Sequence, residues 1–448
     1  MEHRFGLNEF QLKRRDSRVE VRYRPAELIN GHVLMTGMSG VGKSYQLRAM
    51  VGSALAHGLE VDIFDVHDEL DVDGASVARF SESTGYGFNP LVLNPDPHSG
   101  GVRKRINELV RLVGGKRALG VKQEAALRHL LQDVYTLSGC YSDRPESWRK
   151  QEISESRKQE LLQEKNFAAL RKYYPMIDDL LNYADRKLKA LYIGSDSDAV
   201  TALDAVNRQA GALNRLVNKL QRPGNEDEEK ERIERGLEAA KEKAVDLFSR
   251  YVERIETGRE LADVMKYGSR DVLQGVIERV HGLNASGIFR SNPPPFGDSR
   301  VRCYQIKSLS LDEQKVFVAS RIEAIFRRRK DAGLSPDLKH VLVLDEAHKF
   351  IDEDPENPVN VVVKEARKFG LALWAASQSP THFSEDFLAN VGTTVLLGIH
   401  PMYWDMACRK LRIEPKVLKY IKPREVAAIK MQGIGSVESR FQNVVFSG

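Results

Sequence analysis

The octapeptide GMSGVGKS at Gly37–Ser44 most constrains the fold, because it fits the phosphate-binding pattern GxxxxGK[ST]. A short apolar run, HVLMT at 32–36, precedes the octapeptide, and a helical apolar pattern over 45–57 follows it. In such a strand, loop and helix, glycines let backbone N–H groups surround phosphate oxygens at the positive end of the helix. We therefore expect a nucleoside triphosphate site formed by Gly37, Met38, Ser39, Gly40, Val41, Gly42, Lys43, Ser44 and Tyr45.

Four residues are expected to carry the chemistry of ATP and Mg²⁺. Lys43 should contact the β and γ phosphates, and the hydroxyl of Ser44 should ligate Mg²⁺. The apolar run HVLVLDE at 340–346 predicts a buried strand that ends in carboxylates at the edge of the sheet where ligands of open α/β sheets bind. Asp345 is expected to hold the Mg²⁺ shell, and Glu346 to orient and deprotonate an attacking water. Hydrolysis of ATP, rather than binding alone, follows from Glu346.

A polar residue ends a further buried strand. The run LALWAASQ at 371–378 is expected to lie beside the strand at 340–346, and it ends in Gln378. An amide at that position can sense the γ phosphate, although a glutamine is also an ordinary strand terminator. The tetrapeptide DEAH at 345–348 also occurs in a helicase family, but none of the remaining motifs of that family is evident here. The alternative for DEAH is a polar strand end without a catalytic role.

The strand pattern occurs in two separate parts of the chain. About 30 residues precede the first expected strand, and a second strand is expected at 60–66. Strands return after residue 295, around a helix at 311–330. Continuous apolar runs of this kind are typical of buried parallel strands. We therefore expect one α/β sheet built from both parts, with later strands at 301–308, 340–346, 371–378 and 393–399.

Long helical patterns lie between the two parts. One helix is expected at 119–139, and two helices with matching apolar seams at about 198–258 are separated by the break RPGN at 222–225. This pair predicts an antiparallel, coiled-coil-like hairpin. It is either a helical subdomain with a solvated outer face or a contact for a partner or DNA at its tip. The expected domains are the first part of the ATPase core at 1–102, a helical insertion at 103–294 and the second part of the core at 295–448.

Composition limits the remaining possibilities. The chain has 448 residues and a net charge of +5, which does not indicate a partner, because the clustering of Lys and Arg decides nucleic-acid binding. Cys140, Cys303 and Cys408 are isolated and are expected to be reduced thiols. No apolar stretch approaches the roughly 18 residues of a membrane-spanning helix. We therefore expect a cytoplasmic protein without membrane insertion.

Together these segments resemble the HerA/FtsK superfamily of ring-forming motor ATPases, and most closely its HerA-like and conjugative-ATPase branches. The resemblance implies an α/β fold, a RecA-like P-loop NTPase with a mainly parallel sheet, here interrupted by a large all-α insertion. It covers nearly the whole ATPase portion but not the helical hairpin. The segments that carry it are PAELINGHVLMTGMSGVGKS, FDVHDEL, FNPL, LGVKQEAALRHLL, VLVLDEAHKFI, KEARKFGLALWAASQSP, TTVLLGI and VAAIKM.

The resemblance also assigns a role to Arg367. In EARKFG it matches an arginine that reaches the nucleotide of the neighbouring subunit, where a guanidinium stabilises charge on the transferred phosphoryl group. The alternative is a surface basic cluster with Lys364 and Lys368. Asp68 stands where the family usually has glycine before the glutamate, here Glu69. The N-terminal β-barrel domain common in HerA proteins is not expected ahead of the first strand.

The resemblance implies a homo-hexameric ATPase that translocates double-stranded DNA and supplies a separate nuclease or a defence or repair effector. The alternatives are a cytoplasmic ATPase of a secretion or conjugation apparatus and a nucleotide-dependent scaffold for a partner. Basic runs at 103–105 and 327–330 are candidate pore contacts, although each is also typical of a solvated helix face. Such contacts would follow phosphates and depend on salt rather than on base sequence.

Overall fold

The computed structural model divides the chain into two compact units. Unit 1 comprises residues 1–88 and 286–448, and unit 2 comprises residues 89–285. The sequence predicted a helical insertion at 103–294, whereas the helical unit begins at residue 89 and ends at residue 285. The structure describes residues 1–98, 100–114, 118–193, 197–221, 227–253, 263, 266–352, 354–355, 357–436 and 439–446.

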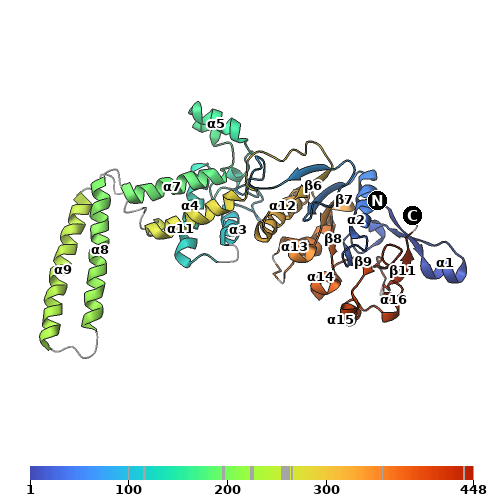
Figure 1. Cartoon of the computed structure of the whole chain (residues 1–448). Coiled ribbons are helices and arrows are strands. Elements are labelled where there is room, and N and C mark those ends of the chain that lie inside the picture. Colours follow the sequence, from blue (N-terminus) through green and yellow to red (C-terminus); the bar gives the residue numbers. More distant parts are fainter. Residues whose placement is uncertain are drawn as a thin grey trace. The chain divides into compact units, whose positions relative to one another are not determined.

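Unit 1 is built on an 11-stranded sheet in the order β2-β1-β11-β10-β9-β3-β8-β7-β4-β6-β5 (Figure 1). Seven adjacent strands run parallel to one another, and all but β5 coincide with strands that the sequence predicted: β9 (Thr393–Gly398), β3 (Val33–Gly37), β8 (Phe369–Ser377), β7 (Ser335–Leu344), β4 (Glu60–Asp65), β6 (Val301–Gln305) and β5 (Ser76–Arg79). The other four pair antiparallel: β10 (Val426–Met431), β11 (Gln442–Val445), β1 (His3–Asn8) and β2 (Glu20–Tyr23).

Side chains of the central strands alternate between two buried faces. Val61 and Ile63 of β4 share an apolar cluster with Met50 of helix α2 (Lys43–Ala56). Phe64, next along β4, faces the other way, and its ring lies 5.2 Å from Tyr304 and 6.4 Å from Phe317 of helix α12 (Leu311–Asp331). Helices therefore cover both faces, as continuous apolar strands require. The other α-helices of unit 1 are α1 (Glu9–Arg15), α13 (Pro358–Glu365), α14 (Glu385–Ala389), α15 (Trp404–Leu411) and α16 (Pro415–Lys419).

The expectation that the first strand lies at 32–36 was wrong, because β1 and β2 precede it. Strand β1 pairs with β11 at the other end of the chain, with Leu7 opposite Val445. These strands are short, carry polar residues and, in β1, a glycine, so their sequences lack the apolar runs of the core. The partner of β1 lies more than 400 residues away, and a local pattern therefore cannot indicate the pairing.

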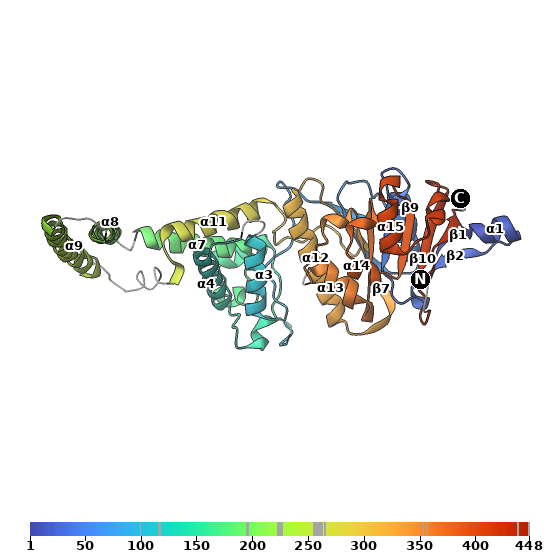
Figure 2. The same ribbon diagram turned by 90° about the horizontal axis from the view of Figure 1, so that it is seen from below.

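Unit 2 is helical in its described residues. Figure 2 shows α3, α4, α7 and α11 gathered in one bundle, and Tyr135 of α4 is fully buried, with its hydroxyl donating to the carbonyl of Leu91 at 3.0 Å. The helix expected at 119–139 is α4. The α-helices are α3 (Val102–Gly114), α4 (Val121–Leu137), α5 (Glu155–Gln163), α6 (Phe167–Leu170), α7 (Ile177–Ile193), α8 (Ser197–Leu220), α9 (Asp227–Glu253) and α11 (Arg270–Ala285).

The expected hairpin is present as α8 and α9, which lie side by side (Figure 1). Halfway along the pair, the side-chain amide of Gln209 donates to the carbonyl of Ala240 at 3.1 Å. The break predicted at 222–225 and the last residues of the expected hairpin, beyond 253, lie outside the described residues.

Candidate nucleotide-binding site

The loop between β3 and α2 has the backbone geometry that phosphate binding needs. Gly40 and Gly42 adopt φ of +79° and +103°, which disfavour residues with a side chain. Gly37 has little room, because an added Cβ would lie 2.6 Å from a methyl carbon of Val41. Helix α2 begins at Lys43, so the loop N–H groups lie at the positive end of a 14-residue helix.

The side chain of Lys43 folds back onto this loop. Its Nζ donates to the carbonyl of Gly37 at 2.7 Å and to that of Met38 at 3.0 Å. Burial lowers the pKa of Lys43, while Glu346 and Asp345 favour the charged form. The ammonium group is therefore held in the loop, on the side of these two carboxylates.

A cleft of about 960 Å³ gathers most of the predicted site residues. Gly37 and Met38 do not line this cleft; they contribute the carbonyls that hold Lys43. The predicted residues that line the cleft are Ser39, Gly40, Val41, Gly42, Lys43, Ser44, Tyr45, Asp345, Glu346 and Gln378.

Asp345 and Glu346 enter the cleft directly after β7. Burial, and next the charge of Glu346, raise the pKa of Asp345 to about 6. Glu346 is 5% exposed and adopts φ +47°, in the left-handed region. The proximity of two carboxylates, half-buried Asp345 and buried Glu346, favours a cation beside them, and Ser44 lines the same cleft. These oxygen donors fit Mg²⁺.

The described residues contain no group of three or more His, Cys, Asp or Glu side chains that could hold a metal ion on protein ligands alone. A Mg²⁺ ion that keeps waters and binds nucleotide phosphates needs only one or two protein ligands. Ser44 and Asp345 are therefore enough protein ligands for such a site.

Gln378 follows the last residue of β8, and β8 pairs in parallel with β7. The expectation that the strand at 371–378 lies beside the strand at 340–346 is confirmed. Because both strands end at the same edge of the sheet, Gln378 and the two carboxylates line one cleft.

Sequence reasoning missed several residues of the cleft wall. Arg424 precedes β10, adopts φ +66°, and donates from Nε to the carbonyl of Gly40 at 3.0 Å. Its segment, KPREV, contains no nucleotide-binding signal. The two ends of the chain also reach the cleft, since His3, Arg4 and Phe5 of β1 and Phe446, which follows β11, line it.

The acidic segment after β4 divides its tasks between two residues. The carboxylate of Asp65 accepts from the backbone N–H of His67 at 3.1 Å and of Leu70 at 2.8 Å, so it shapes the turn. Glu69 and His67 line the cleft. Asp68 adopts φ +59°, a conformation that glycine adopts without strain, and so occupies the family's glycine position in a left-handed turn.

Arg367 lies apart from the cleft of its own chain. It belongs to the 3₁₀-helix η4 (Ala366–Lys368), its side chain is exposed, and it is not among the residues that line the cleft. Of the alternative basic cluster, Lys364 contacts Asp386 at 3.3 Å. An exposed arginine outside its own site is compatible with a role at a neighbouring subunit.

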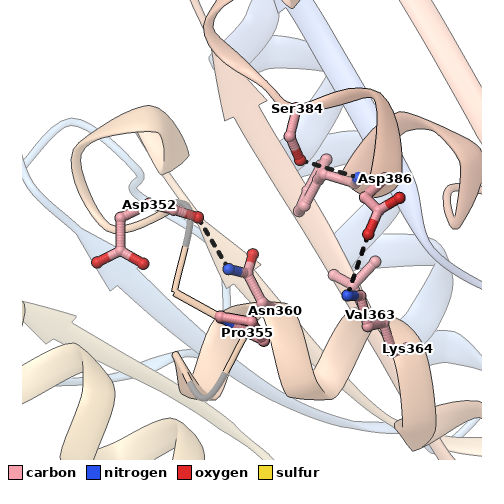
Figure 3. Close-up of a pocket in the computed structure, with 8 residues that line it drawn as sticks. Asp352, Pro355, Asn360, Val363, Lys364, Ser384 and Asp386 are labelled. Atoms are coloured by element: carbon pink, nitrogen blue, oxygen red, sulfur yellow. Dashed lines mark hydrogen bonds and ion pairs between the residues drawn. The ribbon is translucent and has the colours of Figure 1, made fainter.

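A second, smaller pocket of about 320 Å³ lies between α13 and α14 (Figure 3). The Lys364–Asp386 ion pair joins the two helices at one side of this pocket. On the other side, the amide of Asn360 donates to the carbonyl of Asp352 at 2.9 Å. The contact of Asn360 holds the segment that follows the Asp345–Glu346 turn against α13, the helix that leads to Arg367.

The sheet order and the cleft define a P-loop NTPase of the RecA-like class. The structure of VirB4 from Thermoanaerobacter pseudethanolicus has the same fold, with a TM-score of 0.57 and 14% sequence identity over 100% of this chain and 96% of that chain. A family model described as "Helicase HerA, central domain" matches residues 11–318, more than half of the chain. The chain therefore belongs to the family defined by the HerA central domain.

Two curated relatives match part of the chain. The chain is 25% identical over 272 residues to the DNA double-strand break repair helicase HerA of Sulfolobus acidocaldarius, covering 56% of this chain and 49% of the relative. It is 23% identical over 208 residues to the protein of the same name from Pyrococcus furiosus, covering 37% and 38%. The chain thus spans less than half the length of either relative. In the described part of the chain, no helix is long and apolar enough to cross a membrane.

Proposed function

We propose that the protein is a ring-forming, hexameric HerA-like ATPase that translocates double-stranded DNA and supplies a separate nuclease or a defence or repair effector. The observation that carries the proposal is the meeting of the phosphate-binding loop, two carboxylates and Gln378 in one cleft of a chain that belongs to the HerA family. The named relatives are double-strand break repair helicases, which supports DNA as the substrate.

In this proposal each residue has one task in the hydrolysis of ATP. The loop N–H groups and Lys43 bind the phosphates, and Ser44 and Asp345 hold Mg²⁺, which supplies positive charge against the phosphates. Glu346 orients a water and accepts its proton, and Gln378 contacts the γ phosphate. Because the two carboxylates and Gln378 follow neighbouring strands, their relative positions are set by the rigid sheet.

We further propose that Arg367 completes the site of the adjacent subunit. A guanidinium delivered from a neighbour couples hydrolysis to the geometry of the ring. The exposure of Arg367 and its separation from its own cleft support this assignment. Its position at the end of α13, which is tied to the segment after Glu346, gives each subunit a physical link between its own site and the next one.

The DNA contacts are proposed to come from exposed cations such as Arg103 and Lys330. Lys330 lies over the ring of Phe326, and two other members of its run have polar partners within the chain. Arg328 bonds to Glu60 at 2.9 Å, and Arg329 donates to the carbonyl of Phe369 at 3.2 Å. Binding through phosphates would weaken steeply as salt rises.

The second candidate is an ATPase of a secretion or conjugation apparatus, and its support is the fold shared with VirB4 along the whole chain. DNA-stimulated turnover separates the two candidates. ATPase activity is measured with Mg-ATP, with and without long duplex DNA, alongside a Glu346→Gln control. Stimulation by DNA is expected. If long duplex DNA leaves turnover unchanged, both with and without a co-purified partner, the proposal that the protein translocates DNA is wrong.

The oligomeric state needs a measurement of its own. Native mass spectrometry of the purified protein with its co-purifying partner should give the mass of six chains plus that partner. A monomer at all protein and nucleotide concentrations would contradict the ring.

A further inference from the structure

A histidine that the proposed mechanism does not use lies against Glu346. The 3₁₀-helix η3 (Ala347–Lys349) starts directly after Glu346, whose left-handed backbone turns the chain sharply. This turn brings Nδ1 of His348 to 3.3 Å from Oε2 of Glu346. A glutamate in the left-handed region costs roughly 1–2 kcal/mol relative to an ordinary conformation, so the surrounding structure must hold it there.

The same imidazole nitrogen also contacts the neighbouring strand. Nδ1 of His348 lies 3.1 Å from Oγ of Ser377, the last residue of β8. Ser377 immediately precedes Gln378, so one ring spans the turn that bears Glu346 and the strand that bears the proposed γ-phosphate sensor. The ring of His382 lies 4.8 Å from the ring of His348.

Glu346 needs such a partner. Its Oε2 is buried and accepts no hydrogen bond from any group in the described part of the chain, so His348 provides an electrostatic contact without full hydrogen-bond geometry. Burial lowers the pKa of His348, while the charge of Glu346 raises it and those of His382 and Lys349 lower it. A largely neutral ring can hold the carboxylate only as the tautomer that carries its proton on Nδ1.

We propose that His348 is a positioning residue that fixes the carboxylate of Glu346 for hydrolysis and links it to the end of β8 through Ser377. This inference rests on the proposed function of Glu346 as the group that orients and deprotonates water. In this tautomer the single N–H on Nδ1 is shared between Oγ of Ser377, at 3.1 Å, and Oε2 of Glu346, at 3.3 Å. The contact with Ser377 keeps the ring in place, and the electrostatic contact with Oε2 restricts rotation of the carboxylate. His348 does not itself touch the nucleotide in this scheme.

Three variants of His348 test the proposal. In His348→Asn, a side-chain amide occupies the position of Nδ1, whereas in His348→Gln the amide lies further out, near the position of Nε2. Loss of a polar contact to a charged group that acts in the reaction should lower the rate by a factor of about ten or more. We expect His348→Ala to lower kcat about tenfold or more and to leave KM and ATP affinity within about twofold. The Asn variant should recover most of the activity and the Gln variant little.

A double-mutant cycle with Ser377→Ala tests the link between the two strands. If Ser377 acts by orienting His348, Ser377→Ala should lower kcat in the native background and have no further effect in the His348→Ala background. Additive losses would overturn the link. The cycle also remains informative if His348→Ala is poorly folded, because His348→Gln, whose amide lies away from the position of Nδ1, can replace it as the background.

The outcomes separate this inference from the proposed function. If Glu346→Gln turns over ATP at the normal rate, the assignment of Glu346 fails, and the inference fails with it. If Glu346→Gln is inactive while His348→Ala has normal kcat, only the inference fails. A His348→Ala defect confined to KM or ATP affinity, or equal activity of the Asn and Gln variants, would also overturn it.

Discussion

Oδ2 of Asp62 lies 2.6 Å from Nε2 of His340, and both side chains are completely buried. Arg302 binds both oxygens of the same carboxylate, at 3.0 Å and 2.8 Å, and the hydroxyl of Tyr304 donates to it as well. This cluster joins β4, β6 and β7 within the sheet, whereas the nucleotide cleft lies beyond the carboxyl ends of β7 and β8. None of these four residues lines the cleft, so the buried charge cluster is separate from the proposed catalytic site.

Asp62→Asn should destabilise the protein in a pH-dependent way. Burial alone would raise the pKa of Asp62, but the hydrogen bonds from His340 and Arg302 outweigh it and hold that pKa well below its usual range. The stabilisation is therefore fully present above the usual carboxyl pKa of about 4 and is lost as the pH falls below it. We expect a loss of about 2 kcal/mol at pH 7, measured by urea unfolding.

The difference in stability between the native protein and Asp62→Asn should narrow as the pH is lowered below about 4. Asp298→Asn is the matched control, because Asp298 is exposed in a loop and should show neither effect. A difference that stays constant down to pH 3 would contradict the role of the ionised carboxylate.

Lys43→Ala should abolish tight nucleotide binding. The ammonium group is already held in the loop by the carbonyls of Gly37 and Met38, so little reordering is needed when phosphates arrive. Removing it should weaken ATP binding at least tenfold, because a charge-assisted contact is worth about 1.5–3 kcal/mol. Calorimetric titration with Mg-ATP measures this loss, with the exposed Lys419→Ala as the control. If Lys43→Ala binds Mg-ATP with unchanged affinity, Lys43 does not contact the nucleotide.

The sequence was sufficient to predict the residues of the cleft that lie at the ends of apolar strands. The phosphate-binding loop, Asp345 and Gln378 each follow a run of buried residues, and parallel strands place their carboxyl ends together. The sheet, its parallel core and the paired helices α8 and α9 followed from the same periodicities.

Other parts of the cleft could not be predicted, because they depend on distant pairing. Phe446 lies in the cleft through the pairing of β11 with β1 and β10, and no local pattern reports that pairing. Arg424 reaches Gly40 from a turn, and its contribution is one hydrogen bond to a backbone carbonyl. His348 belongs to the DEAH tetrapeptide, but the sequence does not show the left-handed turn at Glu346 that brings the side chains of Glu346 and His348 together.

Gly6→Ala should disrupt the pairing of the two ends of the chain. An added Cβ at Gly6 would lie 2.0 Å from the carbonyl oxygen of Val445, so the backbone of β1 or β11 would have to move. Such overpacking costs about 1–3 kcal/mol, which should appear as a lower Tm. Because residues of β1 and Phe446, which follows β11, line the cleft, ATP affinity should fall too.

Gly52→Ala is the matched control for this experiment. Gly52 lies in the interior of α2, and a Cβ there would meet nothing within 4 Å. The substitution should stabilise the protein by up to about 1 kcal/mol through helix propensity. If Gly6→Ala leaves both Tm and ATP affinity unchanged, the paired termini are not part of the nucleotide site.

Arg367→Ala should bind ATP normally and lose turnover by about a thousandfold, the usual effect of removing an arginine that acts on the transferred phosphate. Lys43→Ala subunits keep Arg367 but lack a working phosphate-binding loop. Mixing the two variants in equal amounts creates interfaces that combine an intact loop with an intact arginine, about a quarter of the total if subunits assemble at random. Activity should therefore reappear on mixing, measured as ATP turnover against the mixing ratio.

Lys368→Ala is the matched control, one residue away and also exposed, and it should keep its activity without being mixed with another variant. If native mass spectrometry detects mixed rings and turnover does not recover, Arg367 does not act on a neighbouring subunit.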